Sequence, residues 1–190
     1  MAFIQKIAKS IWKLNAGSNV YFLDFDEKII IDTGERKERR NLEMFLSKII
    51  DFSRVSKVIF THLHYDHVGN FDLFPNAQFF ASRKEIAAFQ KNPKDAVLDE
   101  SIAERLKAIK LNEIGFEIAG LKVIETPGHT AGSICLWHDS EKILFSGDTL
   151  FDKKMLGRTD LPTSSPGELN NSMLRLLQFN YKILCPGHDY

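Results

Sequence analysis

Three of the six histidines in this chain of 190 residues stand within six consecutive positions, together with one aspartate. Imidazole nitrogen and carboxylate oxygen are ligands that zinc prefers, and iron and manganese also accept them. His62 and His64, two positions apart, project to the same side of an extended backbone. Asp66 and His67 follow where the chain must turn, and there they can face a second ion. The window therefore predicts a metal site, in preference to a polar loop that gathers histidines by chance.

Three further residues of the same kinds each stand directly after a glycine at the end of a predicted strand. They are His129 in TPGHTAGS, Asp148 in FSGDTLF and His188 in CPGHDY. Glycine before a ligand lets the backbone turn sharply and approach an ion without a side chain in the way. One such histidine alone is typical of a protein surface, but three in this context add to the histidine window. We therefore predict that all three belong to the same metal site.

Other residues near these motifs have simpler explanations. His138 lies in WHDSEK, in a predicted hairpin turn, where a solvated side chain is expected. Asp32 in IIDTG either hydrogen-bonds to a metal ligand or caps the turn that follows its strand. Cys185, three residues before the last histidine, is expected to be a small buried apolar residue and not a ligand.

The composition is that of an ordinary globular protein of one domain. Apolar residues make up 44% and charged residues 26%, and a chain of this length can bury a single core. Lys and Arg total 25 and so do Asp and Glu, which gives a net charge of zero. This balance argues against binding to nucleic acid or to an anionic membrane, which usually leaves a basic excess. We therefore expect a small-molecule substrate as the partner, with the oligomeric state left open.

Cysteine usage and hydropathy predict the compartment. The two cysteines, Cys135 and Cys185, are too few for a disulfide framework in a chain of this length. The N-terminal sequence MAFIQKIAKSIWKL carries a lysine every few residues, and no apolar stretch has the length of a signal peptide or a membrane span. These observations predict a cytoplasmic protein.

Strand and helix patterns alternate along the chain. Residues 18–34 predict two strands joined by a turn, and helical spacing of apolar residues predicts helices over 36–50 and 166–178. Further predicted strands cover 55–60, 77–81, 116–126, 133–139, 142–148 and the residues from 181 onward. The polar segment 83–114 predicts two helices broken near Asn92 and Pro93, which form a lid over the site, a dimer contact or a solvated helical pair. This order predicts an α/β fold, a layered sandwich within a single domain of residues 1–190.

Taken together, THLHYDH and the glycine-ligand pairs at 128–129, 147–148 and 187–188 resemble the metallo-β-lactamase superfamily. The segments SNVYF and IIIDTG resemble its opening strands, so the resemblance covers residues from about 18 to 190. It implies a four-layer αβ/βα sandwich with a dinuclear metal site at one edge, between the two sheets. By this resemblance, one ion is held by His62, His64 and His129, the other by Asp66, His67 and His188, and Asp148 bridges the two.

The resemblance implies a hydrolase. Two divalent ions, zinc first and iron or manganese as alternatives, share a water and lower its pKa from about 15.7 towards 7, which yields a bridging hydroxide. The hydroxide attacks the carbonyl of a small acyl substrate, and Asp66 is expected to orient it and accept its proton. No serine or cysteine nucleophile is required.

The segment 157–162 narrows the substrate. Its sequence GRTDLP resembles that of small glyoxalase II-type hydrolases, which cleave thioesters of glutathione. Arg158 is a candidate to bind a substrate carboxylate, unless it pairs with Asp160 to shape the loop. Tyr65, between the ligands, either presents its hydroxyl to the substrate or packs beneath the loop. In full-length glyoxalase II a helical domain follows the last histidine and holds much of the glutathione site, so by this resemblance we expect glutathione recognition to differ here, where two residues follow His188.

Three alternatives to the thioester hydrolase stay open. One keeps the hydrolase and changes the substrate to a lactone or a β-lactam. Another is an iron-dependent oxidoreductase, either an oxygen-reducing di-iron module or a persulfide dioxygenase with one iron on the first three histidines and Asp148, or on a subset of them. The third is a metal-binding structural module without catalysis. The complete second set of Asp66, His67 and His188 favours the dinuclear hydrolase.

Overall fold

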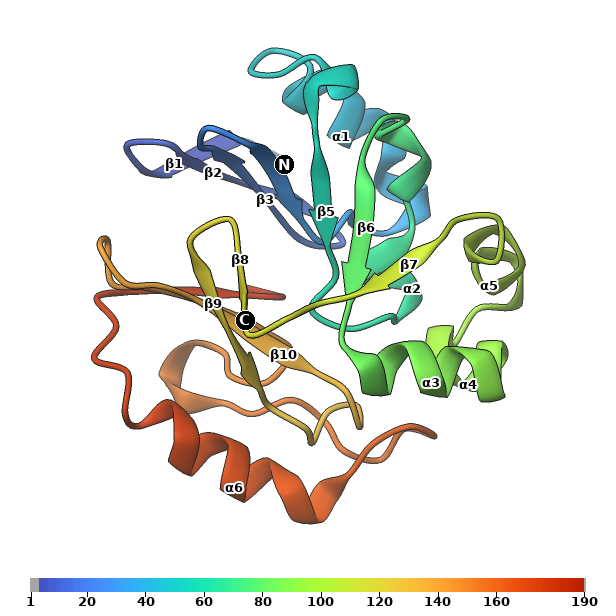
Figure 1. The fold of residues 1–190 in the computed structure, drawn as a ribbon, viewed down its shortest axis with the longest axis vertical. Coiled ribbons are helices and arrows are strands. Elements are labelled where there is room, and N and C mark those ends of the chain that lie inside the picture. Colours follow the sequence, from blue (N-terminus) through green and yellow to red (C-terminus); the bar gives the residue numbers. More distant parts are fainter. Residues whose placement is uncertain (1–3, 190) are drawn as a thin grey trace.

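Two β-sheets pack face to face in the computed structural model, which describes residues 4–189 (Figure 1). The first sheet contains, in spatial order, β1 (Ile4–Ala8), β2 (Ile11–Ala16), β3 (Ser18–Asp24), β4 (Lys28–Ile31), β5 (Lys57–Ile59), β6 (Gln78–Ala81) and β7 (Leu111–Glu113). The second contains β12 (Ile183–Pro186), β11 (Ile143–Gly147), β10 (Ile134–His138), β9 (Leu121–Glu125) and β8 (Glu117–Ile118).

Helices cover the outer face of each sheet. The first sheet is covered by α1 (Arg39–Leu46), α3 (Arg83–Lys91), α4 (Pro93–Val97) and α5 (Glu100–Leu106). On the other side, α6 (Pro166–Leu176) packs against the second sheet (Figure 1). The arrangement is the four-layer αβ/βα sandwich expected from the sequence.

Alternation of side chains along each strand sorts the core into apolar layers. In β4, Ile30 packs with the helices of the first sheet, whereas Ile29 faces the second sheet and shares a layer with Phe145 of β11. On the opposite side of β11, Leu144 packs with Leu176 of α6. The isoleucine run of β4 is apolar on both sides because this strand is buried between two layers.

The polar segment 83–114 contains three helices and a strand, one helix more than predicted. The expected break falls at Asn92, whose side chain accepts a hydrogen bond from the Asp95 amide and so begins α4. A second break follows, where Leu98 adopts a left-handed backbone and Asp99 caps α5. Apolar residues of all three helices, Phe89 among them, pack into the core of the first sheet. The segment therefore helps to cover the seven-stranded sheet.

Two N-terminal strands, β1 and β2, are missing from the sequence-based prediction. Their apolar residues alternate with lysines such as Lys6 and Lys13, a pattern typical of strands near a sheet edge. The predicted helix over 36–50 is shorter in the structure, where a 3-10 turn over Arg36–Glu38 leads into α1. The helix predicted over 166–178 is confirmed by α6. Residues 1–3 and 190, which the predicted domain includes, lie outside the described residues.

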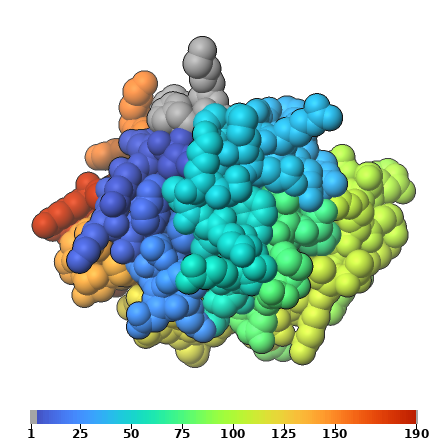
Figure 2. Space-filling view, turned by 90° about the horizontal axis from the view of Figure 1, so that it is seen from above, coloured from blue at the N-terminus to red at the C-terminus, as the bar shows by residue number. Residues whose placement is uncertain are grey.

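The N-terminal half of the chain forms one broad face of the molecule. Seen from above, the segments coloured blue to yellow-green cover this face, and the orange and red C-terminal segments reach it only at one edge (Figure 2). Among the helices of residues 4–189, none combines the length and the apolar character that crossing a membrane requires.

Candidate metal centre

Strand ends bring the predicted ligands together at one edge of the sandwich. His62 and His64 follow β5, the short helix α2 (Tyr65–Val68) carries the next two ligands, and His129 precedes β10. Because β11 and β12 run parallel, with Gly147 paired with Pro186, the residues Asp148 and His188 leave the second sheet side by side. The backbone joins the two sheets here, since the Ile134 amide donates to the Thr61 carbonyl at 3.0 Å.

Potential ligand atoms form three overlapping groups, and the atoms of each group lie within 4.8 Å of one another. The groups are His62 with His64 and His129, His62 with His67 and Asp148, and Asp66 with His67 and His188, so that all seven predicted ligands are included. The carboxylate of Asp148 lies 3.3 Å from Nε2 of His67 and 3.5 Å from Nε2 of both His129 and His188. It therefore contacts members of the first and third groups.

Two glycines let the backbone come close to the cluster. Gly147 has a φ of +48°, a left-handed conformation that favours glycine, and it packs against the Thr61 side chain. At Gly187 a Cβ would overlap an oxygen of Asp148 and crowd the His67 ring. Any larger residue at 187 would therefore displace the carboxylate that both outer groups contact.

Hydrogen bonds at the outer nitrogens orient the imidazole rings. The Nδ1 atoms lie 2.9 Å from the Asp32 carboxylate in His67, 2.8 Å from the Arg158 carbonyl in His129, and 3.1 Å from the Gly17 carbonyl in His188. Carbonyl and carboxylate oxygens only accept hydrogen bonds, so each Nδ1 carries the proton. The Nε2 atom of each ring is thereby turned toward the centre of the cluster as a potential metal ligand.

Asp32 is a buried residue that connects strand β4 to the cluster. Its carboxylate accepts hydrogen bonds from the Thr61 amide and the Thr61 hydroxyl, both at 2.8 Å, besides its contact with His67. The Asp32 side chain therefore orients the ring of His67 and also fixes the backbone at Thr61, which leads to His62 and His64. Of the two explanations that the sequence allowed, the structure shows hydrogen bonding to a predicted ligand, His67.

Two buried polar atoms of the cluster, Nε2 of His62 and Oδ1 of Asp148, have no hydrogen-bond partner among the described residues. In His64 the nitrogen that faces the cluster is Nδ1, which lies 3.0 Å from Nε2 of His129. Buried polar atoms in proteins are nearly always paired. Imidazole nitrogen and carboxylate oxygen can donate their lone pairs to a divalent cation. The residues present therefore fit divalent metal ions.

Burial sets the charge state of the group formed by His62, His64 and His129. It lowers the pKa of His62 well below its usual range, lowers that of His64 to about 3, and also lowers that of His129. These three rings are neutral at pH 7. They can bind a cation without first losing a proton.

Carboxylates reverse this effect at His67 and His188. Burial alone would lower the pKa of His188, but Asp148 and Asp66 raise it to about 9. Burial likewise opposes a charge on His67, yet Asp148 and Asp32 raise its pKa well above the usual value. Burial would raise the pKa of Asp66, but the neighbouring His67 and His188 outweigh it and lower this pKa to about 2. Without a cation, these carboxylates are therefore balanced by protons on the two histidines.

Glu85 of α3 is a buried carboxylate that the sequence did not indicate as part of the site. One oxygen accepts from the Leu63 amide at 3.0 Å, and the other accepts from the Gly132 amide at 3.0 Å and the Thr130 hydroxyl at 2.5 Å. Leu63 stands between two predicted ligands and Thr130 follows a third, so Glu85 ties two ligand loops together. Its spacing from Ser82 is typical of a helix-capping pair, and its place on the apolar face of α3 was the available signal.

Two residues were predicted to contact a substrate. Arg158 forms a bidentate pair with Asp160, and both hydrogen bonds are 2.7 Å long. The ring of Tyr65 packs against the core of the first sheet. Arg158 also faces the cluster pocket, which is lined by His129, Asp148, Phe151, Met155, Leu156 and Arg158. A role in substrate binding stays a prediction for both residues.

The remaining two residues named from the sequence lie apart from the ligand groups. Cys185 is buried between the sheets, as expected. His138 differs from the expectation of a solvated turn residue. It ends strand β10, is partly buried, and stacks on Phe25 with the ring centroids 5.1 Å apart. The strand continues through His138 and carries its ring onto this aromatic neighbour.

A family model described as the metallo-beta-lactamase superfamily matches residues 15–188. The chain belongs to this superfamily. A protein named as a probable metallo-hydrolase, from Streptococcus pyogenes, is 34% identical in a match that covers 97% of this chain and 84% of that one. A hydroxyacylglutathione hydrolase of Prochlorococcus marinus is 33% identical over 70% of this chain, which spans about half (51%) of that protein.

Solved structures agree with the fold. A protein crystallised in a di-iron-bound form superposes with a TM-score of 0.72 and 22% identity, over 99% of this chain and 92% of that one. Membership of the metallo-β-lactamase superfamily, together with the histidine and aspartate cluster, makes this chain a metallohydrolase with a site for divalent metal.

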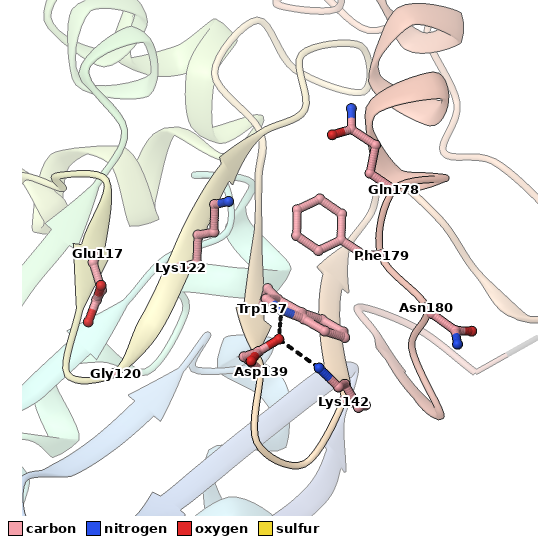
Figure 3. Close-up of a pocket in the computed structure, with 9 residues that line it drawn as sticks. All are labelled: Glu117, Gly120, Lys122, Trp137, Asp139, Lys142, Gln178, Phe179 and Asn180. Atoms are coloured by element: carbon pink, nitrogen blue, oxygen red, sulfur yellow. Dashed lines mark hydrogen bonds and ion pairs between the residues drawn. The ribbon is translucent and has the colours of Figure 1, made fainter.

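A second pocket of this superfamily member, the distal pocket, lies away from the cluster (Figure 3). It has a volume of about 530 Å³, and the rings of Trp137 and Phe179 form part of its wall. Asp139 accepts hydrogen bonds from Trp137 and Lys142 at its rim. The pocket sits where β9 and β11 begin, whereas the cluster sits where they end. It is therefore separated from the metal ligands by the length of the second sheet.

Proposed function

We propose that this protein is a dinuclear metal-dependent hydrolase that cleaves a small thioester of the glyoxalase II type. The observation that carries the proposal is the pair of complete ligand groups that Asp148 contacts together. His62, His64 and His129 would hold one ion, and Asp66, His67 and His188 would hold the other. Bound there, two divalent ions would supply a bridging hydroxide at neutral pH and a Lewis acid for the carbonyl oxygen.

Asp66 is the residue that we assign to the proton. Its carboxylate lies 3.2 Å from Nε2 of His188 and 3.9 Å from Nε2 of His67, and its side chain is 21% exposed. It therefore reaches from the ligand groups toward solvent, where a substrate arrives. Because its low pKa keeps it ionised, Asp66 can orient the nucleophilic water by accepting a hydrogen bond from it.

A thioester suits a site of this kind. The thiolate leaves readily, so no general acid has to protonate the leaving group, and none of the described ligands needs that role. The similarity to a hydroxyacylglutathione hydrolase supports the substrate class, as does the GRTDLP segment. Arg158 is our candidate for a substrate carboxylate, in exchange for its pair with Asp160, and Tyr65 is a second candidate contact.

Zinc is our first choice of metal, and iron or manganese can occupy the same nitrogen and oxygen ligands. The di-iron form of a structural neighbour supports iron as the alternative. A persulfide dioxygenase with a single iron would need only the first ligand group and Asp148. It would leave the group of Asp66, His67 and His188 without a use, which favours the hydrolase.

The same proposal places the protein in the cytoplasm, with a small molecule and neither nucleic acid nor a membrane as its partner. Cys135 and Cys185 are free and buried, which suits a reducing compartment. The net charge of zero agrees with a small substrate.

Thiol release from S-lactoylglutathione tests the function. We expect thiol from the metal-loaded protein, none after chelation, and recovery with zinc, iron or manganese. Asp66→Ala should lower turnover by about 100-fold or more, while Asp26→Ala, an exposed aspartate in the turn after β3, serves as the control. A fully metallated protein that releases no thiol from S-lactoylglutathione or from a longer-chain S-acylglutathione would refute the thioester substrate, and lactones and persulfide-dependent oxygen uptake would then be measured.

A further inference from the structure

The cluster pocket opens directly beside the predicted ligands. Its volume is about 310 Å³, and His129 and Asp148 form the end of it that belongs to the metal centre. The rest of the lining consists of the apolar residues Phe151, Met155 and Leu156 and of Arg158, whose guanidinium is paired with Asp160. A molecule whose reacting carbon sits at the cluster therefore extends one of its substituents into this pocket.

The wall opposite the ligands is apolar. Met155 and Leu156 are 40% and 41% exposed, although large apolar side chains normally lose their solvent contact on folding. Phe151 beside them is nearly buried. Apolar surface that stays exposed at the mouth of a site is typical of a surface that a ligand covers.

The loop that carries this wall is closed on itself. The Phe151 amide donates to the Met155 carbonyl at 2.8 Å, and Leu150 and Leu156 form an isolated antiparallel bridge. At its tip Lys153 and Lys154 both adopt left-handed backbones, with φ of 55° and 61°. Such conformations are unfavourable for residues other than glycine and are often retained at functional sites. The turn holds the apolar side chains in place next to the metal ligands.

We propose that the cluster pocket binds the aliphatic chain of the acyl group, so that the enzyme prefers thioesters of apolar acids longer than lactate. This inference rests on the proposed thioester hydrolysis. Water adds its oxygen to the acyl carbon, the carbon–sulfur bond breaks, and a carboxylate, a thiol and one proton are released. The aliphatic chain lies along Met155 and Leu156 while the thiol part points toward solvent.

Chain length is the measurable consequence. Each methylene that moves from water into an apolar site raises kcat/KM about fourfold when it is fully buried. A series of S-acylglutathiones with acetyl, butanoyl, hexanoyl and octanoyl groups keeps the leaving group constant. We expect kcat/KM to rise at least tenfold along the series.

Variants with matched controls locate the effect. Met155→Gln combined with Leu156→Asn makes the wall polar, and it should flatten the chain-length dependence, so that the octanoyl thioester loses its advantage in kcat/KM over the acetyl thioester. Met44→Gln combined with Leu177→Asn makes the same replacements at exposed positions of α1 and just after α6. This control should keep the full dependence. Melting curves of both variants verify that they fold.

Binding of uncleavable thioethers separates this inference from the proposed function. S-octylglutathione should bind at least tenfold more tightly than S-methylglutathione in calorimetry, and the polar-wall variant should lose the difference. Equal binding, or equal turnover of all chain lengths, would overturn the pocket assignment even if thioesters are hydrolysed. Tight octyl binding without hydrolysis of any thioester would retain the pocket and refute the thioesterase.

Discussion

Replacement of Glu85 by glutamine tests whether the metal ligands depend on a residue that contacts none of them through its own side chain. The carboxylate accepts from the amides of Leu63 and Gly132 and from the Thr130 hydroxyl. In Glu85→Gln, one acceptor oxygen becomes an NH₂ group that faces these donors. At least one buried amide then loses its partner.

The magnitude follows from that loss. A buried donor left without an acceptor costs about 1–3 kcal/mol, and we expect the metal-free variant to be less stable by this amount. Thr130 has a second neighbour, the Ser133 hydroxyl at 2.7 Å, so the two amides dominate the effect. Because the loops before and after these amides carry three predicted ligands, metal affinity should fall about 10–100-fold.

Two measurements separate the effects. Urea unfolding of the metal-free protein gives the stability, and competition with a chromophoric chelator gives the metal affinity. Glu104→Gln on the surface of α5, where Glu104 pairs with Lys107, is the matched control, and it should change stability by less than about 1 kcal/mol. If Glu85→Gln behaves like this control in both assays, the three hydrogen bonds do not hold the ligand loops and the reasoning is wrong.

Two further predictions concern the second ligand group. Asp32→Asn should lower metal affinity about 10–100-fold, because the uncharged amide offers one acceptor oxygen to the three donors of Thr61 and His67 that the carboxylate binds. Unchanged affinity in chelator competition would contradict this role. The raised pKa of His188, about 9, means that below pH 9 a metal must displace its proton. Because His67 also carries a proton there, the second ion displaces two, and its affinity should rise more than tenfold and up to about 100-fold per pH unit toward pH 9. Affinity for the first ion should stay nearly level. As the pH rises from about 6.5 to 9, the metal-free protein loses the stability that protonated His188 contributes. A melting temperature that does not change over this range would contradict the pairing of His188 with Asp66.

The sequence was informative where chemistry and local structure coincide. Five of the predicted ligands lie in loops that border strands, Asp66 and His67 follow on the short helix α2, and Gly147 and Gly187 mark close approaches that only a small residue permits. These features are local, so spacing and residue type were enough to assign the seven residues to one metal site, whereas their division between two ions came from the resemblance to the superfamily. The layered sandwich followed from the order of strand and helix patterns, since apolar periodicity reports which faces are buried.

Features that depend on distant contacts could not be predicted in this way. The lysines of β1 and β2 concealed two strands, because β1 at the edge of the sheet and β2 next to it tolerate charges that a central strand excludes. Glu85, on the apolar face of α3, accepts hydrogen bonds from Leu63 and Gly132, which lie on two loops 22 and 47 residues away in the sequence. Nothing in the local pattern around Glu85 identifies those loops. The apolar wall at Met155 likewise depends on how its loop folds back toward the cluster.

Charge balance gives an independent argument for two ions at this centre. Asp32, Asp66 and Asp148 each contact an imidazole of the cluster, and together they carry three negative charges. A single divalent ion would leave one of these charges to be balanced by a proton on His67 or His188. Two divalent ions supply four positive charges, which leaves one for an anionic nucleophile such as hydroxide. The charge of these carboxylates therefore favours the proposed dinuclear site over a site for a single ion.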